Sequence, residues 1–383
     1  MNNFEIDNVV LNYPDFSHGD DLNFSVLSNP KSYKLKGFER INNVISQVDK
    51  SLSEDSCLII DKQVFNIFFK SFLQKEKEKI FLVDAREENK NIETVLSICN
   101  FFSKNNINKG SNVLVIGGGI LQDLGGTSSY LYKRGIPWTY FPSTLLGISD
   151  SCLGGKTAVN FGDYKNLLGL FSAPSEIVLC SDFIETLSKK DLECGYGEIF
   201  RLLITGGEKS FNVFNENIAS AISGTEASLN SLILNSLLIK KAVVEKDEFE
   251  INIRKSMNYG HTIGHALEAM SNYSIPHGIG VCLGILIEND LFSKLDLMPS
   301  KLNEKIVLSA KKIISDEYIH ILQEMNFNQI AEHLKKDKKT IGSKANFTYL
   351  ENLGKMKFSY TEVDDIQRNL EKSKTDVIEK LLN

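Results

Sequence analysis

The stretch VLVIGGGILQDLGGTSSYLYKRG, residues 113–135, places an apolar run before three consecutive glycines and then a segment of helical character. A buried strand that runs through glycines into a helix is typical of α/β domains that bind a dinucleotide. Glycine lets a pyrophosphate approach the backbone, and the helix N-terminus favours its negative charge. The glycines lack the G-x-G-x-x-G spacing, so a tight turn without a ligand fits equally well. The stretch predicts strand, turn and helix, and leaves the ligand open.

The residues around this stretch repeat the alternation of strand and helix. Short apolar runs that end at polar, glycine or proline residues predict buried strands of a largely parallel sheet at 56–61, 79–84, 112–118, 138–142 and 175–180. Helical patterns lie between them, as at 63–74 and 92–104, so helices are expected on both faces of the sheet. After Leu187 helical periodicity takes over, at 190–206, 211–220, 226–249, 261–272, 278–294, 300–313, 315–323 and 327–335.

This change of pattern near residue 188 divides the chain. The predicted fold class is α/β plus all-α, with an α/β domain at 51–188 and a helical domain at 189–383. Residues 1–50 form an N-terminal extension that the pattern leaves unassigned.

The composition excludes several kinds of partner. The 383 residues carry a formal net charge of −6, which gives no general attraction for nucleic acid or anionic lipid. No apolar run approaches the roughly 20 residues that span a bilayer, and the start lacks a basic region followed by an apolar signal core. We therefore expect a cytoplasmic protein. The six cysteines include no C-x-x-C pair, so buried thiols are expected, not disulfides or a zinc ribbon.

Two polar segments follow predicted strands, where ligands of parallel sheets gather. In AREENKNIETV (85–95), Glu87 and Lys90 suit a ribose hydroxyl or a phosphate, although isolated residues of this kind more often lie in a solvated loop. In PSTLLGISDSCLGGKTAVNFGDYKNLLGLF (142–171), ammonium groups and neutral donors stand among glycines, which suits a phosphate and also a solvated surface loop. The residues concerned are Ser143, Thr144, Asp150, Lys156, Lys165 and Asn166.

Three of the six histidines lie in MNYGHTIGHALEAMSNYSIPHGIG (257–280). His261 and His265 are one helical turn apart and share a face, and His277 offers a further imidazole. No Glu follows the first histidine, which disfavours a zincin protease. Glu198, in ECGYGEIFRLLITGG (193–207), is a candidate carboxylate ligand. Histidines that satisfy core hydrogen bonds, with Glu198 as an ordinary helix-terminus charge, fit the spacing as well.

Together these segments resemble the sugar phosphate cyclase family, and within it the 3-dehydroquinate synthases. The motifs run in family order from about residue 56 to residue 345: REENKNIETV, GGGILQDLGG, YKRG, PSTLL, DSCLGGKTAVN, KNLLGLF, GYGEIFRLL, KKAVVEKDEFEINIRKSMNYGHTIGHALE, HGIGV and DKK. The resemblance implies an N-terminal Rossmann-like NAD-binding domain, a C-terminal helical metal-binding domain and a homodimer.

The resemblance also implies roles for individual residues. It makes Glu198, His261 and His277 the metal ligands and moves His265 to the substrate site. The implied NAD contacts are Asp61, Glu87, Lys90, Gly118, Gly119, Ile120, Gln122, Asp123, Ser143, Thr144, Lys156, Lys165, Phe183 and Thr186. The implied substrate and catalytic residues are Asp150, Lys156, Lys165, Asn166, Arg201, Lys240, Arg254, Asn258, His265 and Lys339, with Arg134 reaching the neighbouring subunit's site.

The implied reaction converts 3-deoxy-arabino-heptulosonate 7-phosphate, a phosphorylated sugar acid, to 3-dehydroquinate and phosphate, with catalytic NAD and Zn²⁺ or Co²⁺. Four positions depart from the usual family pattern: Arg201 for Lys, Gln122 for Gly, Ser143 for Thr and Ile279 for Glu. Arg201 and Gln122 together leave room for a cyclase acting on a different sugar phosphate. A metal- and NAD-dependent polyol dehydrogenase is the alternative from another reaction class, and it would release NADH as product.

Overall fold

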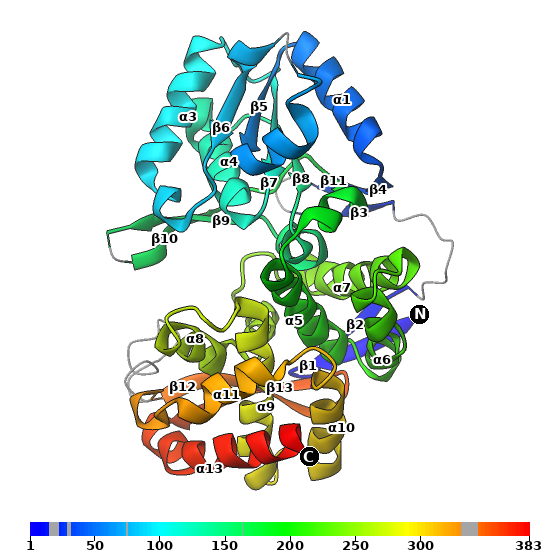
Figure 1. Ribbon diagram of the computed structural model, residues 1–383, viewed down its shortest axis with the longest axis vertical. Helices are drawn as coiled ribbons and strands as arrows, with labels where there is room; N and C mark the ends of the chain where they lie inside the picture. The colour runs from blue at the N-terminus through cyan, green and yellow to red at the C-terminus, as the bar shows by residue number, and fades with distance from the viewer. Residues whose placement is uncertain (15–22, 29–31, 74–75, 163, 331–343) are drawn as a thin grey trace. The chain divides into compact units, whose positions relative to one another are not determined.

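The computed structural model describes residues 1–14, 23–28, 32–73, 76–162, 164–330 and 344–383 (Figure 1). The chain forms two compact units. One comprises Gly19–Ser188, and the other comprises Met1–His18 together with Lys189–Asn383.

The unit Gly19–Ser188 is built on a seven-stranded sheet in the order β3-β4-β11-β8-β7-β5-β6. All neighbouring strands are parallel except the pair β3 and β4. The strands are β3 (Phe24–Val26), β4 (Tyr33–Glu39), β5 (Ser56–Asp61), β6 (Ile80–Val83), β7 (Asn112–Gly117), β8 (Trp138–Pro142) and β11 (Glu176–Cys180). The predicted parallel α/β sheet is confirmed, and β3 and β4, at one end of the sheet, come from the part of the sequence that no pattern assigned.

Helices cover both faces of this sheet. Leu58 and Ile60 of β5 pack in one core cluster with Val44 of α1. Side chains alternate along a strand, so Val115 of β7 points to the opposite face, where a Cβ on Gly125 of α4 would lie 2.6 Å from it. The helices are α1 (Ile41–Ser53), α2 (Lys62–Val64), η1 (Phe65–Phe69), η2 (Lys77–Lys79), η3 (Glu87–Asn89), α3 (Ile92–Lys104), α4 (Gly119–Leu131), η4 (Tyr132–Arg134), η5 (Gly147–Ser151) and η6 (Ser181–Thr186).

An antiparallel hairpin, β9 (Lys156–Phe161) and β10 (Tyr164–Phe171), stands outside the main sheet. It carries most of the polar segment that the sequence singled out, and β9 packs against α4. Lys156, Lys165 and Asn166 therefore lie on a defined hairpin, whereas Ser143, Thr144 and Asp150 precede it in the chain.

The second unit is mainly helical, as predicted. Its helices are α5 (Lys189–Thr205), α6 (Glu208–Ile222), α7 (Glu226–Lys246), η7 (Ile253–Asn258), α8 (His261–Met270), α9 (His277–Lys294), α10 (Ser300–Ala310), α11 (Asp316–Glu324), η8 (Phe327–Gln329) and α13 (Val363–Leu382). The helix expected at 327–335 runs into residues that lie outside the described ranges.

This unit also contains a four-stranded sheet that the sequence did not predict. Its order is β12-β13-β1-β2, so the first residues of the chain pair with residues near its end. The strands are β1 (Asn2–Ile6), β2 (Val9–Tyr13), β12 (Lys344–Asn352) and β13 (Lys355–Glu362). The parallel pairing of β1 with β13 joins segments about 350 residues apart, a contact that no local pattern reveals.

Two expectations about the chain's environment can be compared with this fold. All six cysteines are free thiols, and four of them are buried as predicted, whereas Cys99 and Cys194 are partly exposed. Within the described residues, α7 is the one helix long and apolar enough to cross a membrane, and 67% of its most apolar window is buried inside the protein. That burial is typical of a core helix.

Helices α5, α8 and α9 approach each other through glycines. A Cβ on Gly197 of α5 would collide with the carbonyl of Gly278 of α9. Between α8 and α9, a Cβ on Gly264 would lie 2.9 Å from the carbonyl oxygen of Gly280, and one on Gly284 would strike the carbonyl of Gly260. Backbone therefore touches backbone at both helix pairs, and no larger residue fits there.

Gly197→Ala tests this contact. Because the added methyl group meets backbone that cannot rotate away, we expect the free energy of unfolding to fall by about 3 kcal/mol. Gly119→Ala is the matched control, since nothing lies within 4 Å of its Cβ position. Urea denaturation followed by circular dichroism measures both, and a Gly197→Ala protein as stable as wild type would contradict the close packing.

Candidate functional site

Three potential metal ligands from three helices converge in the helical unit. Glu198 lies on α5, and His261 and His277 are the first residues of α8 and α9. Glu198 Oε1 is 3.2 Å from His261 Nε2 and 3.0 Å from His277 Nε2. One donor atom from each residue lies within 4.8 Å of the other two, which is close enough to hold a single ion.

The glycine contacts explain why these side chains meet. Glu198 directly follows Gly197, His261 directly follows Gly260, and His277 directly precedes Gly278. Each ligand is therefore one residue away from a point where two helix backbones touch. Gly260 has a φ of 78°, a left-handed conformation that glycine adopts without strain, and it turns the chain into α8.

Glu198 is a buried carboxylate, with a side chain only 1% exposed. Arg201 Nε donates to its Oε2 at 2.5 Å from one helical turn away, and Arg201 is itself buried. Burial opposes ionisation of Glu198. The charges of Arg201 and His261 and the hydrogen bonds from both histidines outweigh it and hold the Glu198 pKa well below its usual value. The carboxylate is therefore ionised, as a metal ligand must be.

The two histidines have different electrostatic surroundings. Burial lowers the pKa of His261, and its Nδ1 lies 3.2 Å from the carbonyl oxygen of Tyr259. Burial also opposes the charged form of His277, but hydrogen bonds to Glu198 and Glu268 raise its pKa well above its usual value. Without a cation, His277 thus supplies the positive charge beside Glu198.

Two further carboxylates, which the sequence analysis missed, support this cluster. Glu268 Oε1 lies 2.9 Å from His277 Nδ1. Glu288, fully buried on α9, accepts hydrogen bonds from the backbone N–H groups of Gly260 at 3.0 Å and Ile263 at 3.1 Å, and so caps the start of α8. Helical spacing could have found Glu268, seven residues after His261 on the same face.

The predicted substrate residues of this unit that the structure describes lie on α5, α7, η7 and α8. His265 is exposed, and its ring lies 5.2 Å from that of His261 and stacks 5.8 Å from that of His277. Arg201 Nη1 contacts Met257 Sδ at 3.5 Å, which connects η7 to the cluster.

Arg254 and Asn258 lie on η7, and Lys240 lies on α7, which packs against η7. Arg254 and Lys240 are buried. The Arg254 guanidinium donates to the carbonyl of Glu248, and Asn258 donates to Glu250 Oε1 at 2.9 Å. Lys339 lies outside the described residues.

In the other unit, the structure brings together residues from both predicted polar segments. Lys90 Nζ lies 3.2 Å from Asp123 Oδ2, 3.5 Å from Glu87 Oε1 and 2.6 Å from Asn166 Oδ1. Asp123 Oδ1 also accepts from the Ala158 backbone N–H at 3.0 Å. Burial raises the pKa of Asp123 to about 6 against the opposing charge of Lys90.

The glycine turn has room for a ligand. Gly118 precedes α4 and lies so close to Thr144 that a Cβ would be 2.8 Å from its Cγ2. Nothing lies within 4 Å of the Cβ position of Gly119, the first residue of α4. Ile120 is the second residue of this helix. The Ser143 backbone N–H donates to the Gly117 carbonyl and holds the ends of β7 and β8 together. Backbone donors at a helix start are thereby exposed to approach.

A pocket of about 500 Å³ lies at the ends of β5 and β6. Its lining includes Asp61, the last residue of β5, Asp84, which directly follows β6, and Arg86. Asp61 accepts from the Gln63 backbone N–H at 2.7 Å and so caps α2. A carboxylate at the end of such a strand is suited to ribose hydroxyls.

Other predicted cofactor and substrate residues of this unit differ in accessibility. Lys156, Lys165 and Arg134 are exposed, and Asp150 is buried. Gln122 exchanges two hydrogen bonds with Ser151, at 2.7 and 3.0 Å, so its side chain holds η5 in place. The Phe183 side chain lies in the hydrophobic core with Phe68, so only the backbone of Phe183 and the nearby Thr186 remain for a cofactor contact.

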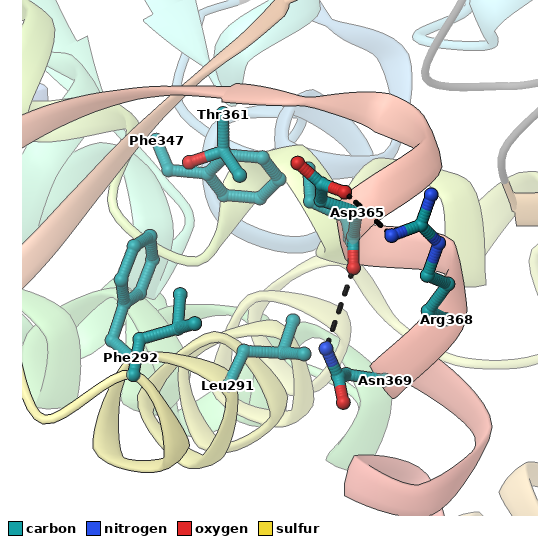
Figure 2. A pocket seen from close by; sticks show the side chains of 9 residues that line it. Leu291, Phe292, Phe347, Thr361, Asp365, Arg368 and Asn369 are labelled. Atoms are coloured by element: carbon teal, nitrogen blue, oxygen red, sulfur yellow. Dashed lines mark hydrogen bonds and ion pairs between the residues drawn. The ribbon is translucent and has the colours of Figure 1, made fainter.

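A separate pocket of about 280 Å³ in the helical unit contains none of the predicted residues (Figure 2). Phe292 and Phe347 line its apolar side, and Asp365 and Arg368, 3.2 Å apart on α13, stand at its rim. Among the residues that the structure describes, its lining includes no histidine or cysteine, so the converging residues on α5, α8 and α9 are the candidate site.

Two family models match consecutive stretches of the chain. Residues 80–194 match the 3-dehydroquinate synthase N-terminal family model, and residues 195–340 match the 3-dehydroquinate synthase C-terminal model. The chain belongs to the 3-dehydroquinate synthase family. The 3-dehydroquinate synthase of Pelagibacter ubique (strain HTCC1062) is 34% identical over 333 residues, covering 82% of this chain and 88% of that protein. The one from Dictyoglomus turgidum (strain DSM 6724 / Z-1310) is 30% identical over 313 residues, covering 82% and 86%.

Solved structures share the fold at lower identity. A 2-deoxy-scyllo-inosose synthase complexed with carbaglucose-6-phosphate, NAD⁺ and Co²⁺ is 21% identical, with a TM-score of 0.77 over 91% of this chain and 99% of that one. The 2-epi-5-epi-valiolone synthase of Streptomyces hygroscopicus subsp. jinggangensis 5008, with NAD⁺ and Zn²⁺ bound, is 20% identical with a TM-score of 0.74 over 92% and 99%. A glycerol dehydrogenase from Schizosaccharomyces pombe is 13% identical with a TM-score of 0.61 over 89% and 88%.

Asp123→Asn tests the electrostatics of the Lys90 group. The folded protein holds a proton on Asp123 up to about pH 6, whereas the unfolded chain releases it near pH 4, so the free energy of unfolding falls as pH rises between these values. The side chain is 20% exposed, so screening limits the expected fall to about 1–3 kcal/mol. Denaturation from pH 4 to 7 should show a shallower decline for the variant. Parallel curves for the two proteins would refute the raised pKa.

Proposed function

We propose that this chain is a 3-dehydroquinate synthase that converts 3-deoxy-arabino-heptulosonate 7-phosphate to 3-dehydroquinate and phosphate. The observation that carries the proposal is the convergence of Glu198, His261 and His277 in a chain of this family. It makes the enzyme a carbon–oxygen lyase acting on phosphates, in the shikimate pathway of aromatic amino acid biosynthesis.

The converging residues fit a divalent metal such as Zn²⁺ or Co²⁺. One carboxylate and two imidazoles are a ligand set that catalytic zinc sites use, with a further position left for substrate. His265 is exposed beside them, so the cluster is accessible from its side of α8. A bound ion supplies Lewis-acid polarisation of substrate hydroxyls and a template for their orientation. The chain's contribution is to hold the three donors ready, with Arg201 keeping Glu198 ionised.

The glycine turn and the pocket at Asp61 fit NAD. Gly118 and Gly119 leave the helix start open to a pyrophosphate, and Asp61 presents a carboxylate suited to the adenosine ribose. Bound NAD would serve as a hydride acceptor that is regenerated within each turnover, so no net oxidation would result. This feature separates the proposal from a polyol dehydrogenase.

The substrate's two anionic groups need cations that the net charge of −6 does not provide in general. We assign that task to Lys156, Lys165, Lys240 and Arg254, with Lys339 as a further phosphate contact and Asp150 and Asn166 near cofactor and substrate. The task of His265 and Asn258 is to relay a proton near the substrate phosphate.

The departures from the family pattern fit this proposal. Arg201 keeps the positive charge beside Glu198, and its Nε makes the contact. Ile279 is fully buried in α9, where an apolar side chain needs no partner. Gln122 and Ser151 satisfy each other.

We further propose that residues 51–188 form the NAD-binding domain and 189–383 the metal- and substrate-binding domain of a cytoplasmic homodimer. Arg134, which would reach the neighbouring subunit, is exposed at a turn where Lys133, Arg134 and Gly135 have φ values of 50°, 62° and 100°. No nucleic-acid or membrane partner is proposed.

Phosphate release tests the reaction. The purified protein, incubated with 3-deoxy-arabino-heptulosonate 7-phosphate, Zn²⁺ or Co²⁺ and NAD at a small fraction of the substrate concentration, should release many phosphates per NAD. The accompanying product should be 3-dehydroquinate, without accumulation of NADH. No phosphate, or a different carbocycle, would reject this substrate. Stoichiometric NADH would favour a dehydrogenase.

His265→Ala separates substrate chemistry from metal binding. We expect turnover to fall by about 10²- to 10⁴-fold, the usual contribution of a proton-transfer group, with the metal content unchanged. His261→Ala, which removes a proposed ligand, should lose the metal as well. Elemental analysis of both dialysed variants distinguishes a metal ligand from a substrate-site residue. Loss of metal from His265→Ala would contradict the assignment of His265 to the substrate site.

A further inference from the structure

The ring of His277 has a carboxylate on each side. Its Nε2 lies 3.0 Å from Glu198 Oε1, and its Nδ1 lies 2.9 Å from Glu268 Oε1. Nε2 is the nitrogen directed at Glu198, which His261 Nε2 also approaches, so a metal held by these three residues takes the Nε2 lone pair. The Nδ1–H group then donates its hydrogen bond to Glu268.

Packing fixes Glu268 in this place. It follows His261 by seven residues and His265 by three, so all three project from one face of α8. Its side chain is only 13% exposed. A Cβ on Gly280 would lie 3.1 Å from Glu268 Cγ, so the glycine leaves the space through which the carboxylate reaches His277.

The arrangement also offers another reading, a second metal held by His265, Glu268 and His277, whose donor atoms lie within 4.8 Å of each other. With Nε2 of His277 committed to the first metal, a second ion on Nδ1 would require a ring stripped of both protons. A neutral imidazole keeps one N–H, and Glu268 lies at hydrogen-bond distance from it. The hydrogen-bonded arrangement is therefore the simpler one.

We propose that Glu268 is the positioning residue of the metal site: it holds His277 in the tautomer and ring orientation that present Nε2 to the metal. The inference rests on the metal site of the proposed function, and neither the family resemblance nor the motif spacing assigned Glu268 a role. A carboxylate behind a ligating histidine also makes the metal-bound nitrogen more basic. Glu268 touches neither substrate nor metal and acts through His277.

Zn²⁺ affinity of the metal-free protein, without NAD or substrate, tests this role. Competition with a chromophoric chelator gives the dissociation constant. Glu268→Leu removes the acceptor, and we expect Zn²⁺ to bind about 10- to 100-fold more weakly. Glu268→Gln keeps an acceptor oxygen and should restore most of the affinity. Glu216→Gln, at an exposed carboxylate of α6, is the control and should bind like wild type.

Circular dichroism of each metal-free variant shows whether the protein is folded. Weaker Zn²⁺ binding by a folded variant then reflects a change at the metal site and not unfolding. Should Glu268→Leu fail to fold, Glu268→Asp replaces it, because the shorter side chain withdraws the carboxylate from Nδ1 and should weaken binding equally. The Co²⁺ visible absorption spectrum of a folded Leu or Asp variant should also differ from that of wild type. A folded Glu268→Leu protein that binds Zn²⁺ as tightly as wild type overturns the proposal. A Glu268→Gln protein that binds Zn²⁺ as weakly as Glu268→Leu also overturns it. A wild-type protein that binds Zn²⁺ but releases no phosphate contradicts the proposed reaction alone.

Discussion

The contact of backbone with backbone among α5, α8 and α9 is the constraint on which the candidate site depends. Gly197 meets Gly278, and Gly264 meets Gly280, at distances that admit no side chain. Each proposed ligand is adjacent in sequence to a glycine of these contacts. Small shifts of one helix would therefore move Glu198, His261 or His277 directly, with no flexible segment between contact and ligand. Rigid helices thus supply the precision that a metal site needs.

Bringing these groups together places several charges in a buried region, which is unfavourable unless each is paired. Glu198 has Arg201 and two histidines around it, and His277 has a carboxylate at each nitrogen. The buried carboxylate of Glu288 accepts hydrogen bonds from backbone N–H groups at the start of α8. Packing and electrostatics therefore select the same arrangement, and a divalent cation would add to the positive charge that already stabilises Glu198.

Much of this organisation could be predicted from sequence. The apolar runs of β5, β7 and β8 gave the parallel sheet because strands buried on both faces leave a continuous pattern. The proposed ligands were predicted from family resemblance, since spacing alone did not distinguish His265 from His277. The sheet of β1, β2, β12 and β13 was missed because its pairing is non-local. The side-chain contacts of Gln122 with Ser151 and of Phe183 with Phe68 were also missed. They depend on neighbours in space that no sequence motif includes.

X-ray absorption spectroscopy of the protein loaded with one equivalent of Zn²⁺ tests the central claim most directly. The arrangement of Glu198, His261 and His277 predicts two imidazole nitrogens and at least one oxygen at about 2.0–2.2 Å, with no sulfur ligand. His261→Ala should reduce the imidazole signal to one ring. A sulfur shell near about 2.3 Å, or a spectrum of oxygen ligands alone, would contradict a metal centre built by the convergence of α5, α8 and α9.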